Sequence, residues 1–346
     1  MKESKAALRT KRLTPAWETR LPDCVVALEW SADGETLAAA AIDGTVSVIP
    51  KRGGAPKNFV AHAGLGALVW HADGQRLVTA GQDGAVRCWA ADGRRNWEYQ
   101  AGRAWLEKLA WSPLPVTAAG AAQKVLAVAN GKQVALLAAD GQLLANSEPL
   151  PSTLADLCWY PNGPLLLVAA YGGLSVLHGV SARRVRTYDW RGAMWNCRWS
   201  PDGRWVCGGS QEHAMHIWAA DSGEHLHMPG YQAKIRALDW SGDGKWLATG
   251  NGPDVLLWNC AGQGPAGAAP LMFGAHSQSV TELRFRHHGE LFAAGGKDGN
   301  LMLWDANGEP APLAAFIGSA PITAARWSPN DKLLAVGDAD GGVVVI

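Results

Sequence analysis

The sequence predicts an all-β fold built from a repeated unit, and three observations lead to this prediction. An aromatic residue recurs along almost the whole chain at nearly constant spacing. Each aromatic is followed by short runs that alternate apolar and polar residues, as strands with one buried face do. Asp-Gly and Asn-Gly pairs lie between many of these runs, and such pairs favour the tight turns that join antiparallel strands.

The recurring aromatics divide the chain into eight units, because they are separated by 40, 41, 48, 40, 41, 45 and 42 residues. These aromatics are Trp30, Trp70, Trp111, Trp159, Trp199, Trp240, Phe285 and Trp327. Each unit shows three strands, and we expect a fourth, less regular one before the next unit, for example at 94–100 and 224–228. The pattern predicts a single closed β-propeller of four-stranded antiparallel blades, most favourably eight. Seven blades is the runner-up, because residues 114–125 stretch the third unit.

The repeat resembles the WD-repeat family over about residues 14–346. In that family a His before the innermost strand, a Ser or Thr in the second, an Asp in the second turn and a Trp in the third form a buried hydrogen-bonded set. The second unit matches with His62, Thr79, Asp83 and Trp89, and the seventh keeps only His276, Asp298 and Trp304. Units three and four lack these markers, so we expect apolar packing to hold them.

The two ends of the chain are expected to close the ring, since an open row of blades would expose unpaired strand edges. The last unit ends at Ile346 after three strands, and residues 14–21 precede the first unit without a blade of their own. As the resemblance implies, residues 14–21 should supply the outer strand of the last blade. The predicted organisation is therefore a basic flexible tail, residues 1–13, and one propeller, residues 14–346.

Composition limits the kinds of partner and compartment. Lys plus Arg equals Asp plus Glu at 31 each, which argues against nucleic acid or an anionic membrane as the main partner. No apolar run is long enough for a membrane span or a signal peptide. The six cysteines form no Cys-x-x-Cys pair and are expected to be free buried thiols. We expect a cytoplasmic protein, and the Ala- and Gly-rich composition suggests a bacterial one.

Motifs of catalysis are absent from the sequence, which has no Walker-type phosphate loop, no Gly-x-Ser-x-Gly elbow and no His-Glu-x-x-His pair. We therefore expect a non-catalytic scaffold for protein–protein interaction that is monomeric, needs no cofactor and presents the loop face of the propeller to one or more protein partners.

Binding is expected on the face where the inner strands begin, because the loops before these strands and the turns between second and third strands converge there. Arginine and aromatic side chains are typical of binding hot spots. The predicted partner-binding residues are Arg103, Trp105, Arg191, Trp195, Tyr231, Arg236, Lys297, Gln82 and Gln211. The alternative is that Trp105 and Trp195 are wedges between blades.

Two alternative ligands follow from other side chains. If residues 220–223 form a turn, His216, His225 and His227 share one face of a hairpin, and three neutral imidazoles suit Zn, Cu or Ni. Residues just before the recurring aromatics are expected to point into the channel, namely Glu29, Cys158, Arg198, Asp239, Arg284 and Arg326. There they form internal ion pairs, or Arg198, Arg284 and Arg326 hold a small anion.

Overall fold

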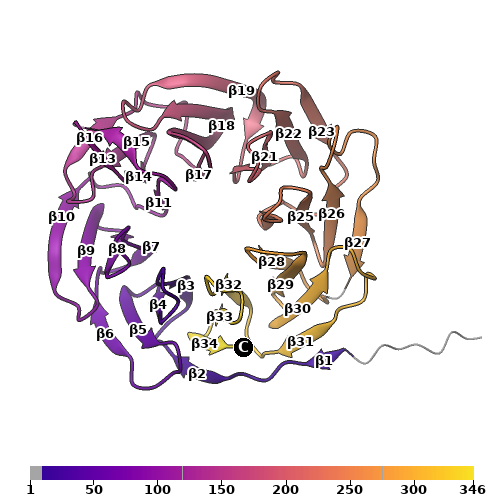
Figure 1. The fold of residues 1–346 in the computed structure, drawn as a ribbon, viewed down its shortest axis with the longest axis horizontal. Helices are drawn as coiled ribbons and strands as arrows, with labels where there is room; N and C mark the ends of the chain where they lie inside the picture. The colour runs from indigo at the N-terminus through magenta and orange to yellow at the C-terminus, as the bar shows by residue number, and fades with distance from the viewer. Residues whose placement is uncertain (1–9, 119, 275) are drawn as a thin grey trace, which may run out of the picture.

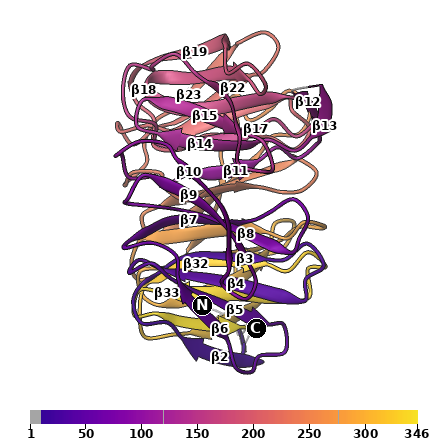
Figure 2. The same ribbon diagram turned by 90° about the vertical axis from the view of Figure 1, so that its left-hand side faces the viewer.

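A computed structural model describes residues 10–118, 120–274 and 276–346. Eight antiparallel sheets stand around a central channel and form a closed ring (Figure 1), which Figure 2 shows edge-on. No helix occurs among the described residues. The predicted eight-bladed propeller is confirmed, and the seven-bladed alternative is wrong.

Each blade lists its strands from the channel outwards. Blade 1 comprises β3 (Val25–Trp30), β4 (Thr36–Ala41), β5 (Thr45–Pro50) and β6 (Lys57–Val60), and blade 2 comprises β7 (Leu65–Trp70), β8 (Arg76–Gly81), β9 (Ala85–Ala90) and β10 (Arg95–Gln100). Blade 3 comprises β11 (Leu109–Trp111), β14 (Leu126–Asn130), β15 (Gln133–Leu137) and β16 (Leu143–Asn146), and blade 4 comprises β17 (Asp156–Trp159), β18 (Leu165–His178) and β19 (Arg184–Ala193).

The second half of the ring repeats this order. Blade 5 comprises β20 (Arg198–Trp199), β21 (Trp205–Gly209), β22 (Met215–Ala219) and β23 (His225–Met228), and blade 6 comprises β24 (Leu238–Trp240), β25 (Trp246–Asn251), β26 (Asp254–Asn259) and β27 (Leu271–Gly274). Blade 7 comprises β28 (Val280–Phe285), β29 (Leu291–Gly296), β30 (Asn300–Asp305) and β31 (Ala314–Ile317), and blade 8 comprises β32 (Ile322–Trp327), β33 (Leu334–Asp338), β34 (Gly342–Val345) and β2 (Trp17–Arg20). The outer strands expected at 94–100 and 224–228 are β10 and β23.

Blade 4 keeps four strands because β18 folds back on itself. Its first half pairs with the inner strand β17, and its second half pairs with the outer strand β19. The N–H of Gly179 donates to the carbonyl of Pro164 at 2.7 Å, so the two ends of β18 lie side by side. The reversal occurs at Tyr171-Gly172-Gly173, where both glycines have positive φ. Second and third strands are therefore one continuous hairpin.

The N-terminal strand closes the ring as expected, since β2 pairs antiparallel with β34 and completes blade 8. Its Trp17 indole donates to the carbonyl of Lys51 in blade 1 at 2.8 Å and packs on Gly53. Just before it, β1 (Lys11–Arg12) pairs in parallel with β31 and adds a fifth strand to blade 7. The segment at 10–20 therefore straps blades 7 and 8 together (Figure 1). Residues 1–9 of the expected tail lie outside the described residues.

The hydrophobic core is divided into eight clusters, and each cluster lies between two consecutive blades. One of them joins blade 8 to blade 1 through Val345 and Leu28, so the ring has no seam without a core. The cluster between blades 3 and 4, which lack the polar markers, contains the largest number of buried residues. A blade thus buries both of its faces only when both neighbours are present.

Indole groups join the inner strands of neighbouring blades. Several recurring tryptophans donate Nε1–H to a backbone carbonyl on the inner strand of the preceding blade. These bonds run from Trp30 to Arg326 (3.1 Å), from Trp70 to Glu29 (2.9 Å), from Trp159 to Ala110 (2.9 Å) and from Trp327 to Arg284 (3.1 Å). The recurrence seen in the sequence therefore reflects a contact between units as well as packing within one.

The buried polar set of blade 2 is fully connected. His62 bonds through Nδ1 to Asp83 at 2.9 Å and through Nε2 to the Thr79 hydroxyl at 2.8 Å, and that hydroxyl also accepts the Trp89 indole N–H at 2.8 Å. This network ties the loop before the inner strand to the second strand, the second turn and the third strand. It fixes the shape of the turn at 82–84.

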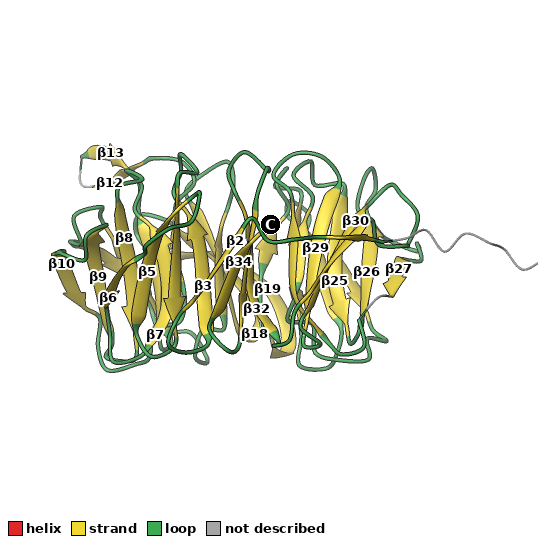
Figure 3. Ribbon diagram, turned by 90° about the horizontal axis from the view of Figure 1, so that it is seen from below, coloured by secondary structure: helices red, strands yellow, loops and turns green. Residues whose placement is uncertain are grey.

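The insertion in the third unit forms a hairpin outside the blade. Strands β12 (Val116–Ala118) and β13 (Ala121–Gln123) pair with each other and stand off one face of the disc (Figure 3). They connect the inner strand to the second strand of blade 3, so they lie on the face opposite to the predicted binding face. The insertion lengthens the unit without removing a strand.

Candidate partner-binding face

The face on which the inner strands begin is called the upper face. Six of the nine predicted residues are exposed charged or amide side chains on it, namely Gln82, Arg103, Arg191, Gln211, Arg236 and Lys297. They come from the loops before the inner strands and from the turns between second and third strands, which are held by backbone hydrogen bonds across each blade. The upper face therefore presents these groups from a rigid frame.

Trp105, before the inner strand of blade 3, is 44% exposed. Its indole lies against the backbone of Gly66 in blade 2, where a Cβ atom would come within 2.8 Å of the ring nitrogen. Trp105 therefore has both properties that the sequence left open, since it wedges between two blades and still offers an exposed ring surface.

Trp195, before the inner strand of blade 5, is half-buried and lies under two cations of blade 6. Lys234 Nζ is 4.8 Å and Arg236 Cζ is 5.2 Å from the centre of the indole ring. Both distances are within the range of cation–π attraction. The two blades thus combine to form one aromatic and cationic site at the mouth of the channel.

Tyr231 is a correction to the predicted binding residues, because it is only 6% exposed. Its hydroxyl lies 2.9 Å from the Thr249 hydroxyl and accepts the Trp258 indole N–H at 2.9 Å. Tyr231 therefore replaces the histidine of the buried polar set in blade 6 and is not available to a partner. Its spacing carried this signal, since Tyr231 precedes Trp240 by nine residues, as His276 precedes Phe285.

Tyr171 is an upper-face residue that the sequence argument missed. It lies in the turn between the second and third strands of blade 4 and is 54% exposed. Gln82 holds the same place in blade 2, so the rule that selected Gln82 also selects Tyr171. Together with Trp105 and Trp195 it gives each of three consecutive blades one accessible aromatic ring on this face.

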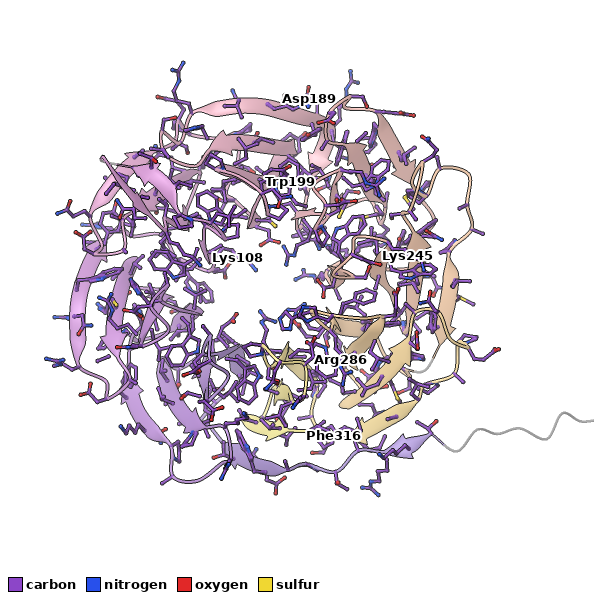
Figure 4. All side chains as sticks on the ribbon, viewed as in Figure 1. Lys108, Asp189, Trp199, Lys245, Arg286 and Phe316 are labelled. Atoms are coloured by element: carbon purple, nitrogen blue, oxygen red, sulfur yellow. The ribbon has the colours of Figure 1, made fainter. Side chains whose placement is uncertain are left out.

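The channel arginines are paired with carboxylates. Arg198 lies 2.6 Å from Asp156, Arg284 lies 2.7 Å from Glu282, and Arg326 lies 3.2 Å from Glu29. Side chains from all around the ring approach the channel, where Lys108 lies at its edge (Figure 4). The structure therefore places internal ion pairs where the anion site was considered, and Arg198, Arg284 and Arg326 do not form an unpaired set.

Charge and burial set the protonation of the channel. Burial alone would raise the pKa of Asp156, but the neighbouring Arg198 outweighs it and lowers this pKa. Asp239, which accepts the N–H of Phe285 at 2.8 Å, has its pKa raised by burial. Burial also raises the pKa of the Cys158 thiol. The channel contains a network of fixed ion pairs and a protonated thiol.

The three histidines of blade 5 do lie together. Strand register pairs His216 with His227 and Trp218 with His225, as the turn at 220–223 predicted. The rings stack, however, with interplanar angles of 8° between His216 and His225 and 18° between His216 and His227. Stacked imidazoles direct their nitrogen lone pairs along the ring planes and not toward one point, and His216 Nδ1 bonds to His225 Nε2 at 3.0 Å.

The predicted Zn, Cu or Ni site is therefore not supported. Within residues 10–118, 120–274 and 276–346, no group of three His, Cys, Asp or Glu side chains could hold a metal ion. Burial, followed by repulsion from His225 and His227, lowers the pKa of His216 to about 3. The cluster is a neutral aromatic stack that also includes Trp190, whose ring centre is 4.0 Å from that of His216.

Fold and site together define a repeat protein that presents a ring of loops. The model of the WD40 family (WD domain, G-beta repeat) matches residues 19–49, 55–90, 183–219, 223–259, 270–305 and 311–346. These matches cover more than half of the chain, which therefore belongs to the WD40 family. The unmatched interval contains the inner strands of blades 3 and 4, the two blades that lack the polar markers.

Curated relatives match part of the chain. The ribosome biogenesis protein WDR12 homolog of Drosophila mojavensis is 24% identical over 166 residues, which are 42% of this chain and 38% of the relative. The anaphase-promoting complex subunit cdc20 of Dictyostelium discoideum is 26% identical over 145 residues, which are 40% of this chain and 28% of the relative. The chain thus matches less than half the length of these relatives. Both are eukaryotic and do not support the expected bacterial origin.

Among solved structures, Sqt1 of Chaetomium thermophilum bound to the N-terminus of the ribosomal protein L10 has a TM-score of 0.78 and 17% identity, covering 94% of this chain and 97% of that chain. A second structure of the same Sqt1 has a TM-score of 0.78 and 16% identity. At these identities the likeness concerns the fold. The described residues include no helix that is long and apolar enough to cross a membrane.

Proposed function

We propose that this protein is a non-catalytic scaffold that binds a protein partner on its upper face. The observation that carries the proposal is the row of accessible aromatic rings on three consecutive blades, Trp105, Tyr171 and Trp195, interleaved with exposed arginines. Such side chains bury a large area on binding and lose little conformational entropy. The ring supports them rigidly, which lowers the cost of association.

The solved structures support this proposal by analogy. Sqt1, which has the same fold, was solved with the N-terminus of a ribosomal protein bound. A propeller of this shape can therefore hold a segment of another protein. The analogy does not name the partner of the present chain, because the identity of 17% concerns the fold alone.

A catalytic role is not part of the proposal. The carboxylates of the channel are held by arginines or by backbone N–H groups, and the Cys158 thiol stays protonated because burial raises its pKa. We further propose a monomer in the cytoplasm. Six free thiols are compatible with a reducing compartment, and the strap of β1 and β2 covers the outer edges of blades 7 and 8 within one chain.

Affinity capture from native lysate tests the scaffold. The double variant Arg191→Ala, Trp195→Ala should lose a stoichiometric protein partner that the wild type retains. The control is Lys57→Ala, Val60→Ala on the outer strand of blade 1, where Val60 is 69% exposed. Equal capture by both variants would refute the upper face as the binding site. Metal content of the same eluates separates the alternative, because a bound transition metal without a protein would favour the histidine cluster.

A further inference from the structure

Trp195 is held in a fixed position at the mouth of the channel. The next residue, Asn196, is 5% exposed and donates from Nδ2 to the carbonyls of Ile235 (2.9 Å) and Arg236 (3.1 Å) in blade 6. Its Oδ1 accepts the N–H of Gly209 at 2.8 Å. Every polar atom of the Asn196 amide that can bridge the two blades is thus used, and the loop carrying Lys234 and Arg236 is fixed against blade 5.

Lys234 and Arg236 lack acidic partners. Among the described residues no carboxylate lies within 4.0 Å of either cation, whereas Arg198, Arg284 and Arg326 deeper in the channel all have one. The same holds for the upper-face cations Arg103, Lys108, Lys132 and Arg191. The charge of the channel is internally balanced, and the charge of its upper rim over blades 3, 5 and 6 is not.

A cavity of about 460 Å³ opens beside this platform. Trp195, Asn196 and Arg236 line its rim, and Lys108 lines the opposite side. The indole N–H of Trp195 is buried and has no hydrogen-bond partner among the described residues. The site therefore offers an aromatic surface, an unused N–H donor and cations without counter-charges, a combination that suits a carboxylate next to an apolar group.

We propose that this site takes a carboxylate-bearing, extended segment of a protein partner, with an Asp or Glu side chain or a terminal carboxylate held by Lys234 and Arg236. This inference deepens the proposed function and rests on it. A nucleic-acid strand fits less well, because Glu107, Asp156 and Glu282 line the same cavity and would repel a continuous row of phosphates. One localised negative charge meets the rim cations and avoids these carboxylates.

Fluorescence anisotropy with three labelled probes tests this chemistry, using a hexaglutamate peptide, a hexaglutamine peptide and an oligothymidylate of similar length. Hexaglutamate should bind, and the variant Lys234→Gln, Arg236→Gln should weaken this binding at least about tenfold. The matched control, Lys57→Gln, Arg94→Gln, removes the same charge from the outer strand of blade 1 and a lower loop of blade 2, and it should change binding less than about twofold. Added salt should weaken the wild-type interaction.

Other outcomes overturn the inference. Equal binding of hexaglutamine, equal loss in both variants, or tighter binding of oligothymidylate that depends on Lys234 and Arg236 would each exclude a carboxylate-selective site. The scaffold proposal fails separately, in the capture experiment. If capture depends on Arg191 and Trp195 but not on Lys234 and Arg236, the scaffold stands and the carboxylate inference fails. Unchanged circular dichroism shows that the variants fold.

Discussion

The Thr79 hydroxyl joins His62 and Trp89 in blade 2, and blade 7 has Ala294 in the corresponding position. The His276 Nε2 and Trp304 Nε1 atoms are both buried without a hydrogen-bond partner among the described residues. His276 still bonds to Asp298 through Nδ1 at 3.1 Å. Blade 7 therefore contains the polar set of blade 2 without its central hydroxyl, at a cost in unsatisfied groups.

Restoring this hydroxyl should stabilise the protein. We expect Ala294→Thr to raise the free energy of unfolding by about 1 kcal/mol, because one hydroxyl would satisfy two buried groups. Ala294→Val is the matched control, since it has the same shape and no hydroxyl and should give no gain. Urea denaturation measures both. In blade 2 the reverse change, Thr79→Val, should lower stability by about 2 kcal/mol, and equal effects of Thr and Val at 294 would contradict the argument.

His216 predicts a pH dependence. Its pKa in the folded protein is lowered to about 3 by burial and by His225 and His227, while the unfolded chain has an ordinary value of about 6.5. Between these values the unfolded chain binds more protons, so stability falls as the pH falls from about 6.5 toward 3, by up to about 1.4 kcal/mol per pH unit. Denaturation at pH 7 and pH 5 should show a smaller difference in His216→Leu than in wild type. His288→Leu, at an exposed site, should behave as wild type.

Residue types at fixed spacing predicted the polar set of blade 2, the free thiols and the histidine register. Ring orientation and burial were not predictable in the same way. Tyr231 is exposed or buried depending on whether its hydroxyl finds Thr249, and that contact joins residues 18 apart in two separate segments. The indole bonds between blades were also hidden, because their acceptors are backbone carbonyls, which every residue possesses.

At the scale of elements, the outer strands meet the next blade in one repeated contact. Trp17 of β2 packs on Gly53 of blade 1, Phe59 of β6 on Gly93 of blade 2, and Trp97 of β10 on Gly141 of blade 3. These three glycines have positive φ, and a Cβ at any of them would collide with the ring. The N-terminal strand β2 thus acts as a regular outer strand, although it comes from the opposite end of the chain.

Loss of this contact should weaken the closure. Trp17→Ala removes the hydrogen bond to Lys51 and the packing on Gly53, and we expect it to lower the free energy of unfolding by about 2–3 kcal/mol. Trp105→Ala is the control, because Trp105 is 44% exposed and does not take part in closure. Its effect on thermal or urea unfolding should be less than half as large. A larger loss from Trp105→Ala would contradict this assignment.

The strands of each unit were predictable because turn pairs and alternation occur within one segment. The strap was predictable only in part. Residues 14–21 could be assigned to blade 8 because that blade lacked a strand, whereas β1 has two residues and no alternation. Its parallel pairing with β31 depends on the edge of blade 7, which is complete without it, so no gap in the repeat announced it.

For the whole molecule, the eight shared cores make the ring cooperative. Removing residues 1–21 should destabilise blades far from the cut as well as blade 8, because each blade buries one face against its neighbour. Hydrogen exchange should therefore show faster exchange in blade 4, on the other side of the ring, than in wild type. Faster exchange confined to blades 7, 8 and 1 would show instead that the ring opens locally.

The pairing of β2 with β34 also constrains the order of folding. Trp17 and Val345 are partners across nearly the whole length of the chain, so this ladder has a higher entropic cost of loop closure than any hairpin within a blade. Blades can condense one after another from neighbouring hairpins, and the first strand to be synthesised is then among the last to find its place. During that interval β34 is an uncovered template for another strand, and a chaperone that shields it, or a neighbouring chain that captures it, would decide between a ring and an aggregate.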